Sequence, residues 1–310
     1  MEYRTLPRSN LQVSVIGFGA SPLGNEFQVI DPVEGERAVH HAIDRGINFF
    51  DVSPYYGRTL AEQRLGAALA GKRDRVVLAT KCGRYDTSYF DFSAARITAS
   101  VEESLRRLRT EYVDILHAHD IESGDREQIV NETLPAMRKL KEQGKVRLIG
   151  ITGFPLKVLA DVAVRGGADV VMSYCRYNLL VRDLDVHLAP VLDRNGIGLL
   201  NASPLHMGIL TERGAPAWHP APESVREAGK KVIALARARG IDAAEAALRF
   251  CLDHPCISST FIGMSKPEHV DANLKALEIR TDPEFLAQVE QAAGAALNQT
   301  WPSGRPENQD

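Results

Sequence analysis

Eight short apolar runs, each followed by a helical pattern, constrain the fold of this chain more than any other feature. The runs are rich in β-branched residues, as strands covered on both faces are. They lie at residues 13–19, 47–52, 75–81, 113–119, 146–152, 169–174, 198–203 and 258–263. Strands that alternate with helices favour a parallel sheet, and eight such units are typical of a closed (β/α)8 TIM barrel.

Both ends of the chain have more residues than such a barrel needs. Residues 1–12 are expected to form a hairpin around the turn-forming residues 7–10, and an extra helix and a tail are expected beyond residue 280. No linker interrupts the alternation, so we expect one domain over residues 1–310. A doubly wound open sheet is the alternative, but GFGASPLG at residues 17–24 lacks the GxGxxG turn of that fold.

Composition and charge narrow the class of protein. The chain has 37 basic and 40 acidic residues, a net charge of -3, which argues against a nucleic-acid partner. No leader and no long apolar segment is visible, so a cytoplasmic protein without a membrane partner is expected, as a monomer or weak homo-oligomer. The four cysteines, which form no CxxC pair, are expected to be reduced thiols: Cys82, Cys175, Cys251 and Cys256.

Polar residues gather where the second, third and fourth runs end. Active sites of such barrels lie at the carboxyl ends of the strands. Asp51 and Tyr56 follow the second run, Lys81 closes the third, and His117 and His119 close the fourth. One acid, one phenol, one ammonium and an imidazole are therefore expected to meet on one rim.

This set has a chemical logic. A free tyrosine has a pKa of about 10, and a neighbouring ammonium lowers it. Tyr56 with Lys81, held in place by Asp51, is a plausible acid–base unit. Residues two apart on a strand share a face, so His117 and His119 are candidate metal ligands, but no further ligand motif accompanies them and we expect no metal. We expect one histidine to face the site and the other to pack lower in the barrel.

Five stretches resemble, in the same order, the motifs of the aldo-keto reductases. They are residues 46–57 (GINFFDVSPYYG), 79–81, 112–119, 144–150 and 261–267. The resemblance implies a (β/α)8 barrel that uses NAD or NADP for hydride transfer. It places a catalytic tetrad on Asp51, Tyr56, Lys81 and His119, the histidine that lies five residues after Asp114. Tyr56 would exchange the proton and His119 would orient the substrate oxygen.

The resemblance also implies a set of residues that bind the cofactor. They are Thr152, Ser173 and Tyr174 for the carboxamide, Ser203, Leu205, Met207 and Gly208 for the pyrophosphate, and Gly263, Met264, Ser265, His269 and Asn273 for the adenosine end. Tyr174 departs from the glutamine common in the family. Gly263 and His269 stand where relatives that prefer NADP often carry lysine and arginine, which favours NAD, while Lys266 keeps NADP open.

Residues 117–122, 173–177 and 298–304 resemble a branch of aldose 1-dehydrogenases of the L-galactose, L-fucose and D-arabinose type. This implies oxidation of a sugar's anomeric carbon to the lactone, with Tyr55, Asp120, His206 and Trp301 as candidate substrate contacts. Trp301 could instead anchor the tail. The alternatives are an NADPH-dependent aldehyde or ketone reductase of broad specificity, a lyase or aldolase with a Schiff base on Lys81, and a cofactor-binding regulatory subunit without turnover.

Overall fold

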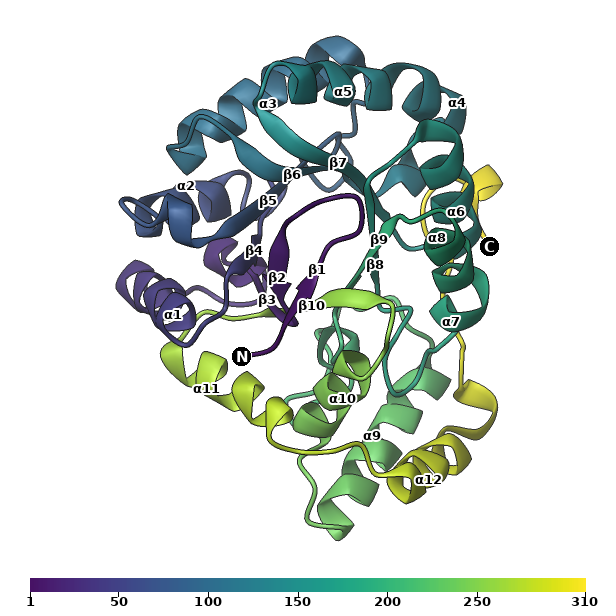
Figure 1. Cartoon of the computed structure of the whole chain (residues 1–310). Helices are drawn as coiled ribbons and strands as arrows, with labels where there is room; N and C mark the ends of the chain where they lie inside the picture. Colours follow the sequence, from purple (N-terminus) through teal and green to yellow (C-terminus); the bar gives the residue numbers. More distant parts are fainter.

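Eight parallel strands close into a barrel in the computed structural model, which describes residues 1–310 (Figure 1). The order around the barrel is β10-β3-β4-β5-β6-β7-β8-β9, so each strand lies beside its neighbour in sequence and β10 closes the ring against β3. The strands are β3 (Ile16–Gly19), β4 (Phe49–Asp51), β5 (Val77–Cys82), β6 (Val113–Ala118), β7 (Val146–Gly153), β8 (Val170–Tyr174), β9 (Gly198–Ala202) and β10 (Ile257–Gly263). The predicted (β/α)8 barrel is confirmed.

An antiparallel hairpin covers the end of the barrel where the strands begin (Figure 1). It pairs β1 (Tyr3–Thr5) with β2 (Gln12–Ser14), and Leu6, Leu11 and Val13 pack into the barrel interior. The hairpin was predicted, but its bounds were wrong. The apolar run at residues 13–19 is two strands, because Ser14 ends the hairpin while Ile16 begins the barrel.

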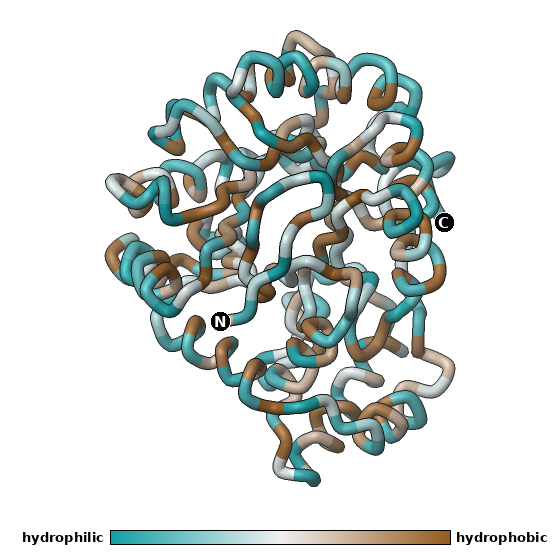
Figure 2. Tube along the Cα trace, viewed as in Figure 1, coloured by the Kyte–Doolittle hydropathy of each residue, from teal (hydrophilic) through white to brown (hydrophobic).

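Helices surround the strands with their apolar faces inward (Figure 2). Several begin at the side-chain caps that helix propensity favours: Asp31 accepts from Val33 N, Ser93 from Arg96 N and Asp242 from Ala244 N. The helices are α1 (Pro32–Asp44), α2 (Leu60–Ala68), α3 (Ala94–Leu108), α4 (Arg126–Gln128), α5 (Leu134–Glu142), α6 (Leu156–Gly166), α7 (Leu184–His187), α8 (Ala189–Arg194), α9 (Glu223–Ala238), α10 (Ala243–Leu252), α11 (Pro267–Leu274) and α12 (Pro283–Ala293). The turn from α4 to α5 is a π-helix, Ile129–Thr133.

The barrel interior changes from apolar to polar along the strands. Side chains alternate between the two faces of a strand, so Phe49 and Ile115 lie inside in the apolar layer. Two residues further along the same strands, Asp51 and His117 face the same way. The polar layer therefore occupies the carboxyl ends of the strands, as predicted from the runs.

The chain end returns from α12 to the barrel and finishes beside α6 (Figure 1). Trp301 is 9% exposed and its ring stacks on Phe154 at a centroid distance of 4.5 Å. The carboxylate of Asp310 accepts hydrogen bonds from Leu156 N at 2.8 Å and Lys157 N at 3.0 Å, at the start of α6. It also pairs with Arg176 at 2.9 Å. These contacts fix the tail to the rim of the barrel.

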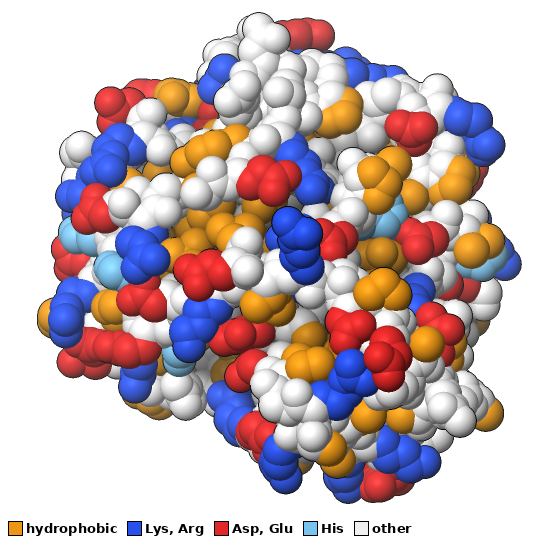
Figure 3. Space-filling model, turned by 60° about the horizontal axis from the view of Figure 1, so that its bottom comes forward, with side chains coloured by type: hydrophobic (Ala, Val, Ile, Leu, Met, Phe, Trp, Pro, Cys, Tyr) orange, Lys and Arg blue, Asp and Glu red, His pale blue; other side chains and the backbone are white.

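Charged side chains of both signs are interspersed over the face seen in Figure 3. That face carries no continuous basic stripe of the kind that tracks a phosphate backbone. No helix in the structure is both long enough and apolar enough to cross a membrane.

Candidate active site

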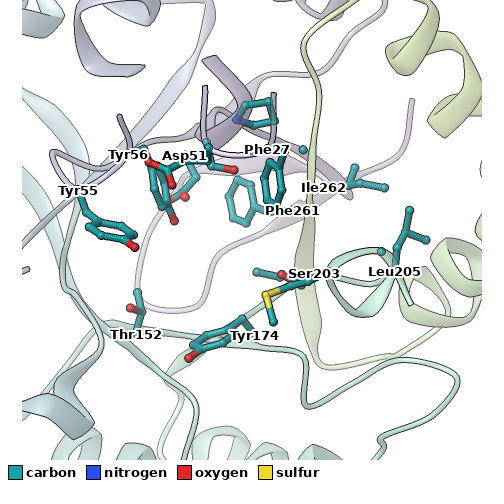
Figure 4. A pocket seen from close by; sticks show the side chains of 18 of the residues that line it. Phe27, Asp51, Tyr55, Tyr56, Thr152, Tyr174, Ser203, Leu205, Phe261 and Ile262 are labelled. Atoms are coloured by element: carbon teal, nitrogen blue, oxygen red, sulfur yellow. The ribbon is translucent and has the colours of Figure 1, made fainter. Parts of the chain in front are cut away.

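A cavity of about 780 Å³ opens at the carboxyl ends of the strands. Figure 4 shows Tyr55, Tyr56, Thr152 and Tyr174 around its inner part, with Phe27 and Leu205 further along. It extends to the start of α11, where Ser265 and His269 line it. The cavity thus joins the predicted catalytic residues to the predicted adenosine end.

A buried ion pair forms the floor of this cavity. Lys81 Nζ donates to Asp51 Oδ2 at 2.5 Å and to the carbonyl of Val52 at 2.9 Å. The same ammonium lies 4.8 Å from the centre of the Tyr56 ring. Burial disfavours the ammonium, but Asp51 and Tyr56 outweigh burial and raise the pKa of Lys81. A charged, paired ammonium is a poor nucleophile, which argues against a Schiff base on Lys81.

The acidity of Tyr56 differs from the sequence-based expectation. The positive charge of Lys81 does pull the pKa of the phenol down, as predicted. Burial is the larger effect, and the neighbouring carboxylates of Asp51 and Asp120 add to it, so the pKa of Tyr56 is raised to about 12. Tyr56 therefore holds its proton at neutral pH.

His119 and His117 separate in height, as the sequence predicted. His119 lines the cavity, and its Nδ1 lies 3.1 Å from the hydroxyl of Ser53. His117 is fully buried one step lower, and neither ring nitrogen has a hydrogen-bond partner. Burial, together with the charges of Lys81 and Arg84, lowers the pKa of His119 well below its usual value. The ring at the cavity is a neutral imidazole.

A second charged pair borders the cavity beside His119. Arg84 pairs with the Oδ2 oxygen of Asp120, which lies 3.7 Å from His119 Nε2. The guanidinium stacks on the Tyr55 ring at 3.8 Å, so both charges are held in place. The backbone N–H of Asp120 donates to Thr152 Oγ1 at 3.1 Å, which ties the pair to the end of β7.

Most residues expected to bind the cofactor line the cavity, but three do not. Those that line it are Thr152, Tyr174, Ser203, Leu205, Met207, Gly208, Gly263, Ser265 and His269. Met264 and Ser173 are fully buried in the wall behind it, and Asn273 lies on α11 outside the lining. The roles of all twelve remain predictions.

The four candidate substrate contacts also divide into residues that line the cavity and one that does not. Tyr55, Asp120 and Trp301 line the cavity, whereas His206 is fully buried and faces Trp301 at a centroid distance of 5.5 Å. Trp301 does anchor the tail, since one ring face is occupied by Phe154. Stacking on a sugar stays a prediction for this residue.

Comparison with known proteins gives the family. The model of the Aldo/keto reductase family matches residues 15–293. This chain belongs to that family. It is 45% identical to the L-galactose dehydrogenase of Arabidopsis thaliana, over 99% of each chain, and 28% identical to a D-threo-aldose 1-dehydrogenase of Pseudomonas, over 87% of this chain and 92% of that one. A solved aldo-keto reductase from Bacillus halodurans, in its holo form, superposes with a TM-score of 0.80 at 27% identity and full coverage of both chains.

Sequence reasoning missed many of the residues that line this cavity. Those with large or charged side chains include Arg84, Arg213, Phe27 and Trp218. Arg84 could have been found, because it follows Lys81 by three residues at the same strand end. The other three lie on loops after β3 and β9, and the pattern of apolar residues does not determine the conformation of a loop. The rings of Phe27 and Trp218 approach to 6.2 Å.

A buried glutamate joins the tail to the cavity rim. Glu122 Oε1 accepts from Phe154 N at 3.2 Å and from Ser303 Oγ at 3.1 Å. Its carbonyl accepts from Arg305 N and from the Asn308 side chain, both at 2.9 Å. Burial, and then the charge of Asp120, raise the pKa of Glu122 to about 8.

This pKa predicts a pH-dependent stability. Between the usual pKa of 4.5 and about 8 the folded protein keeps a proton that the unfolded chain releases, so stability falls with rising pH. One such proton gives a slope of about 1.4 kcal/mol per pH unit. Glu122→Gln, which keeps shape and charge neutrality, should flatten this slope and be more stable than wild type at pH 8. Urea unfolding between pH 5 and 8.5 measures the free energy of unfolding at each pH, with the exposed Glu142→Gln as control. If this free energy falls with pH equally in wild type and in Glu122→Gln, the slope does not come from Glu122.

Proposed function

We propose that this chain oxidises the anomeric carbon of an aldose, of the L-galactose, L-fucose or D-arabinose type, to the lactone with a nicotinamide dinucleotide as acceptor. The observation that carries this proposal is the buried Lys81–Asp51 pair directly beneath Tyr56, with His119 beside it in one cavity. The names of its aldose dehydrogenase relatives support the choice of sugar. We treat residues 1–310 as one domain, because the tail completes the cavity wall at Trp301.

The residues of the chain supply positioning and proton chemistry. During oxidation Tyr56 accepts the hydroxyl proton, which requires the phenolate that Lys81 stabilises. Neutral His119 donates a hydrogen bond to the reacting oxygen and fixes its direction. We propose that the Arg84–Asp120 pair binds the remaining hydroxyls, since one group donates and the other accepts. A nicotinamide bound in the cavity would take up the hydride from the anomeric carbon.

The cavity fits a dinucleotide. Its volume of about 780 Å³, with Tyr56 and His269 both in its lining, allows an extended ligand between these two residues. A side chain at Gly263 would place Cβ 3.0 Å from Pro22 and so narrow the passage. At the far end Arg213 lines the cavity near the start of α11, where the positive end of the helix dipole favours an anion. These residues would hold the phosphates and the adenosine.

We propose NAD as the preferred dinucleotide. His269 Nδ1 accepts from Ser265 N at 3.3 Å, and burial together with Lys266 lowers the pKa of this imidazole. A neutral ring suits a ribose hydroxyl better than the 2′-phosphate of NADP. Arg213 and Lys266 are exposed and able to pair with solvent instead.

His269→Arg should shift the preference toward NADP. A charged hydrogen bond contributes about 1.5–3 kcal/mol, so kcat/KM for NADP should rise by roughly tenfold or more while that for NAD changes little. Initial rates with both dinucleotides measure this shift. His187→Arg is the matched control, because His187 is exposed on α7 outside the cavity lining, and the same change there should leave the ratio unchanged. A wild type that already uses NADP better than NAD would contradict the proposal.

Absorbance at 340 nm tests the proposed function directly. The purified protein is offered NAD or NADP with L-galactose, L-fucose, D-arabinose and simple alcohols. Reduction that depends on an aldose supports the proposal. Turnover of aldehydes with NADPH alone would make the chain a broad reductase instead, and dinucleotide binding, followed by fluorescence, without turnover of any substrate would make it a regulatory subunit.

A further inference from the structure

A buried hydroxyl lies against the Nδ1 side of the His119 ring. Ser53 follows β4 by two residues and is fully buried. Its Oγ accepts a hydrogen bond from Tyr55 N at 3.1 Å and lies 3.1 Å from His119 Nδ1. These are the two hydrogen-bond partners of the hydroxyl, one of which is a backbone donor.

The direction of the second hydrogen bond follows from the first. Tyr55 N can only donate, so Ser53 Oγ is an acceptor in that contact. The hydroxyl hydrogen then needs an acceptor, because a buried donor without a partner costs about 1–3 kcal/mol. His119 Nδ1 is the acceptor within reach. A nitrogen that accepts carries no proton, so the proton of the neutral ring resides on Nε2.

The other side of the ring agrees with this tautomer. His119 Nε2 lies 3.7 Å from the Oδ2 oxygen of Asp120, a carboxylate that favours an N–H over a lone pair. Arg84 holds that carboxylate, and its guanidinium rests on the ring of Tyr55. Ser53, Tyr55, Arg84, Asp120 and His119 therefore form a closed ring of contacts around the imidazole.

We propose that Ser53 is the positioning residue that keeps His119 protonated on Nε2 and aimed at the reacting oxygen. Only the Nε2–H tautomer can donate a hydrogen bond into the cavity, so the hydroxyl acts on the reaction through His119. The proposal rests on the proposed role of His119. It does not depend on which sugar or dinucleotide is used.

The tautomer is measured without turnover. Long-range proton–nitrogen NMR spectra of protein labelled with ¹⁵N-histidine separate protonated from unprotonated ring nitrogens, and His119→Gln assigns the signals. The expected spectrum of wild type shows His119 protonated on Nε2, with Nδ1 accepting a hydrogen bond that is lost in Ser53→Ala and kept in Ser53→Thr. A wild-type ring protonated on Nδ1 would overturn the proposal.

Kinetic measurements distinguish a role of Ser53 in positioning His119 from a purely structural role in the turn that Ser53 forms with Tyr55. Ser53→Ala should lower kcat by about tenfold, the loss of one hydrogen bond, with the affinity for the dinucleotide unchanged and a small fall in melting temperature, because Tyr55 N also loses its acceptor. Ser53→Thr should restore kcat. In a His119→Gln background Ser53→Ala should have no further effect, because its partner is already absent. An equal tenfold loss in both backgrounds would show that the hydroxyl serves the turn alone.

Discussion

Replacing Tyr56 with phenylalanine lowers kcat for aldose oxidation by about 10² to 10⁴, the contribution of a positioned acid or base. The variant keeps the ring that packs over Lys81 and loses only the hydroxyl, so folding and dinucleotide binding stay as in wild type. Initial rates at 340 nm and a fluorescence titration measure the two effects. Tyr112→Phe is the control, since it removes a hydroxyl from a tyrosine outside the cavity lining.

The pH dependence gives a second view of the same group. With a pKa of about 12, Tyr56 is protonated at neutral pH, and the fraction able to accept a proton grows as pH rises. Wild-type kcat for oxidation should therefore increase from pH 7 to pH 10, while the residual activity of Tyr56→Phe should not follow this rise. A Tyr56→Phe variant as active as wild type would assign the proton transfer to another group.

Replacing Lys81 with methionine should damage both stability and activity. The change leaves the Asp51 carboxylate buried without its partner, which typically costs about 3–5 kcal/mol. Without the ammonium the pKa of Tyr56 rises further, so kcat should fall by about 10² or more. Asp51 would then take up a proton on folding, and the lost stability should be greater at pH 8 than at pH 5. Urea unfolding at both pH values and initial rates measure these effects.

The double variant Asp51→Asn/Lys81→Met separates the two roles of the pair. It removes both charges, so most of the lost stability should return, because a neutral amide costs less to bury than an unpaired carboxylate. Activity should stay low, since Tyr56 has no ammonium beside it. Recovery of activity together with stability would mean that the pair serves the fold alone.

The order of apolar runs was enough to predict the barrel, because parallel strands buried on both faces leave a clear pattern. The same pattern did not show that the run at residues 13–19 is divided into two strands near Ser14. Residues 13–19 are apolar almost throughout, and only the pairing of Tyr3 with Ser14 shows that the first part belongs to the hairpin. Burial alone does not distinguish a hairpin strand that plugs the barrel from a strand within its wall.

For the candidate site, the position of a residue at the end of a strand was a better guide to its place in the site than its residue type. Asp51, Lys81 and His119 meet because strand ends meet, and this was visible in the sequence. The pKa of Tyr56 was not visible in the sequence, since the burial that raises it depends on every residue that covers the ring. Arg213 and Trp218, which line the cavity, were not predicted either, because they lie on a long loop whose conformation no periodicity encodes.

The closure of β10 against β3 sets an order of events during synthesis of the chain. Ile16, in the first barrel strand made, lies opposite Thr260 in the last. While the ribosome works between these two points, β3 presents an open edge to other chains. Even after the barrel closes, the cavity wall is incomplete until Trp301 and the contacts of Asp310 are in place. A nascent chain therefore holds its catalytic groups well before it can close the barrel around them, and the edge of β3 is open to aggregation until β10 is made.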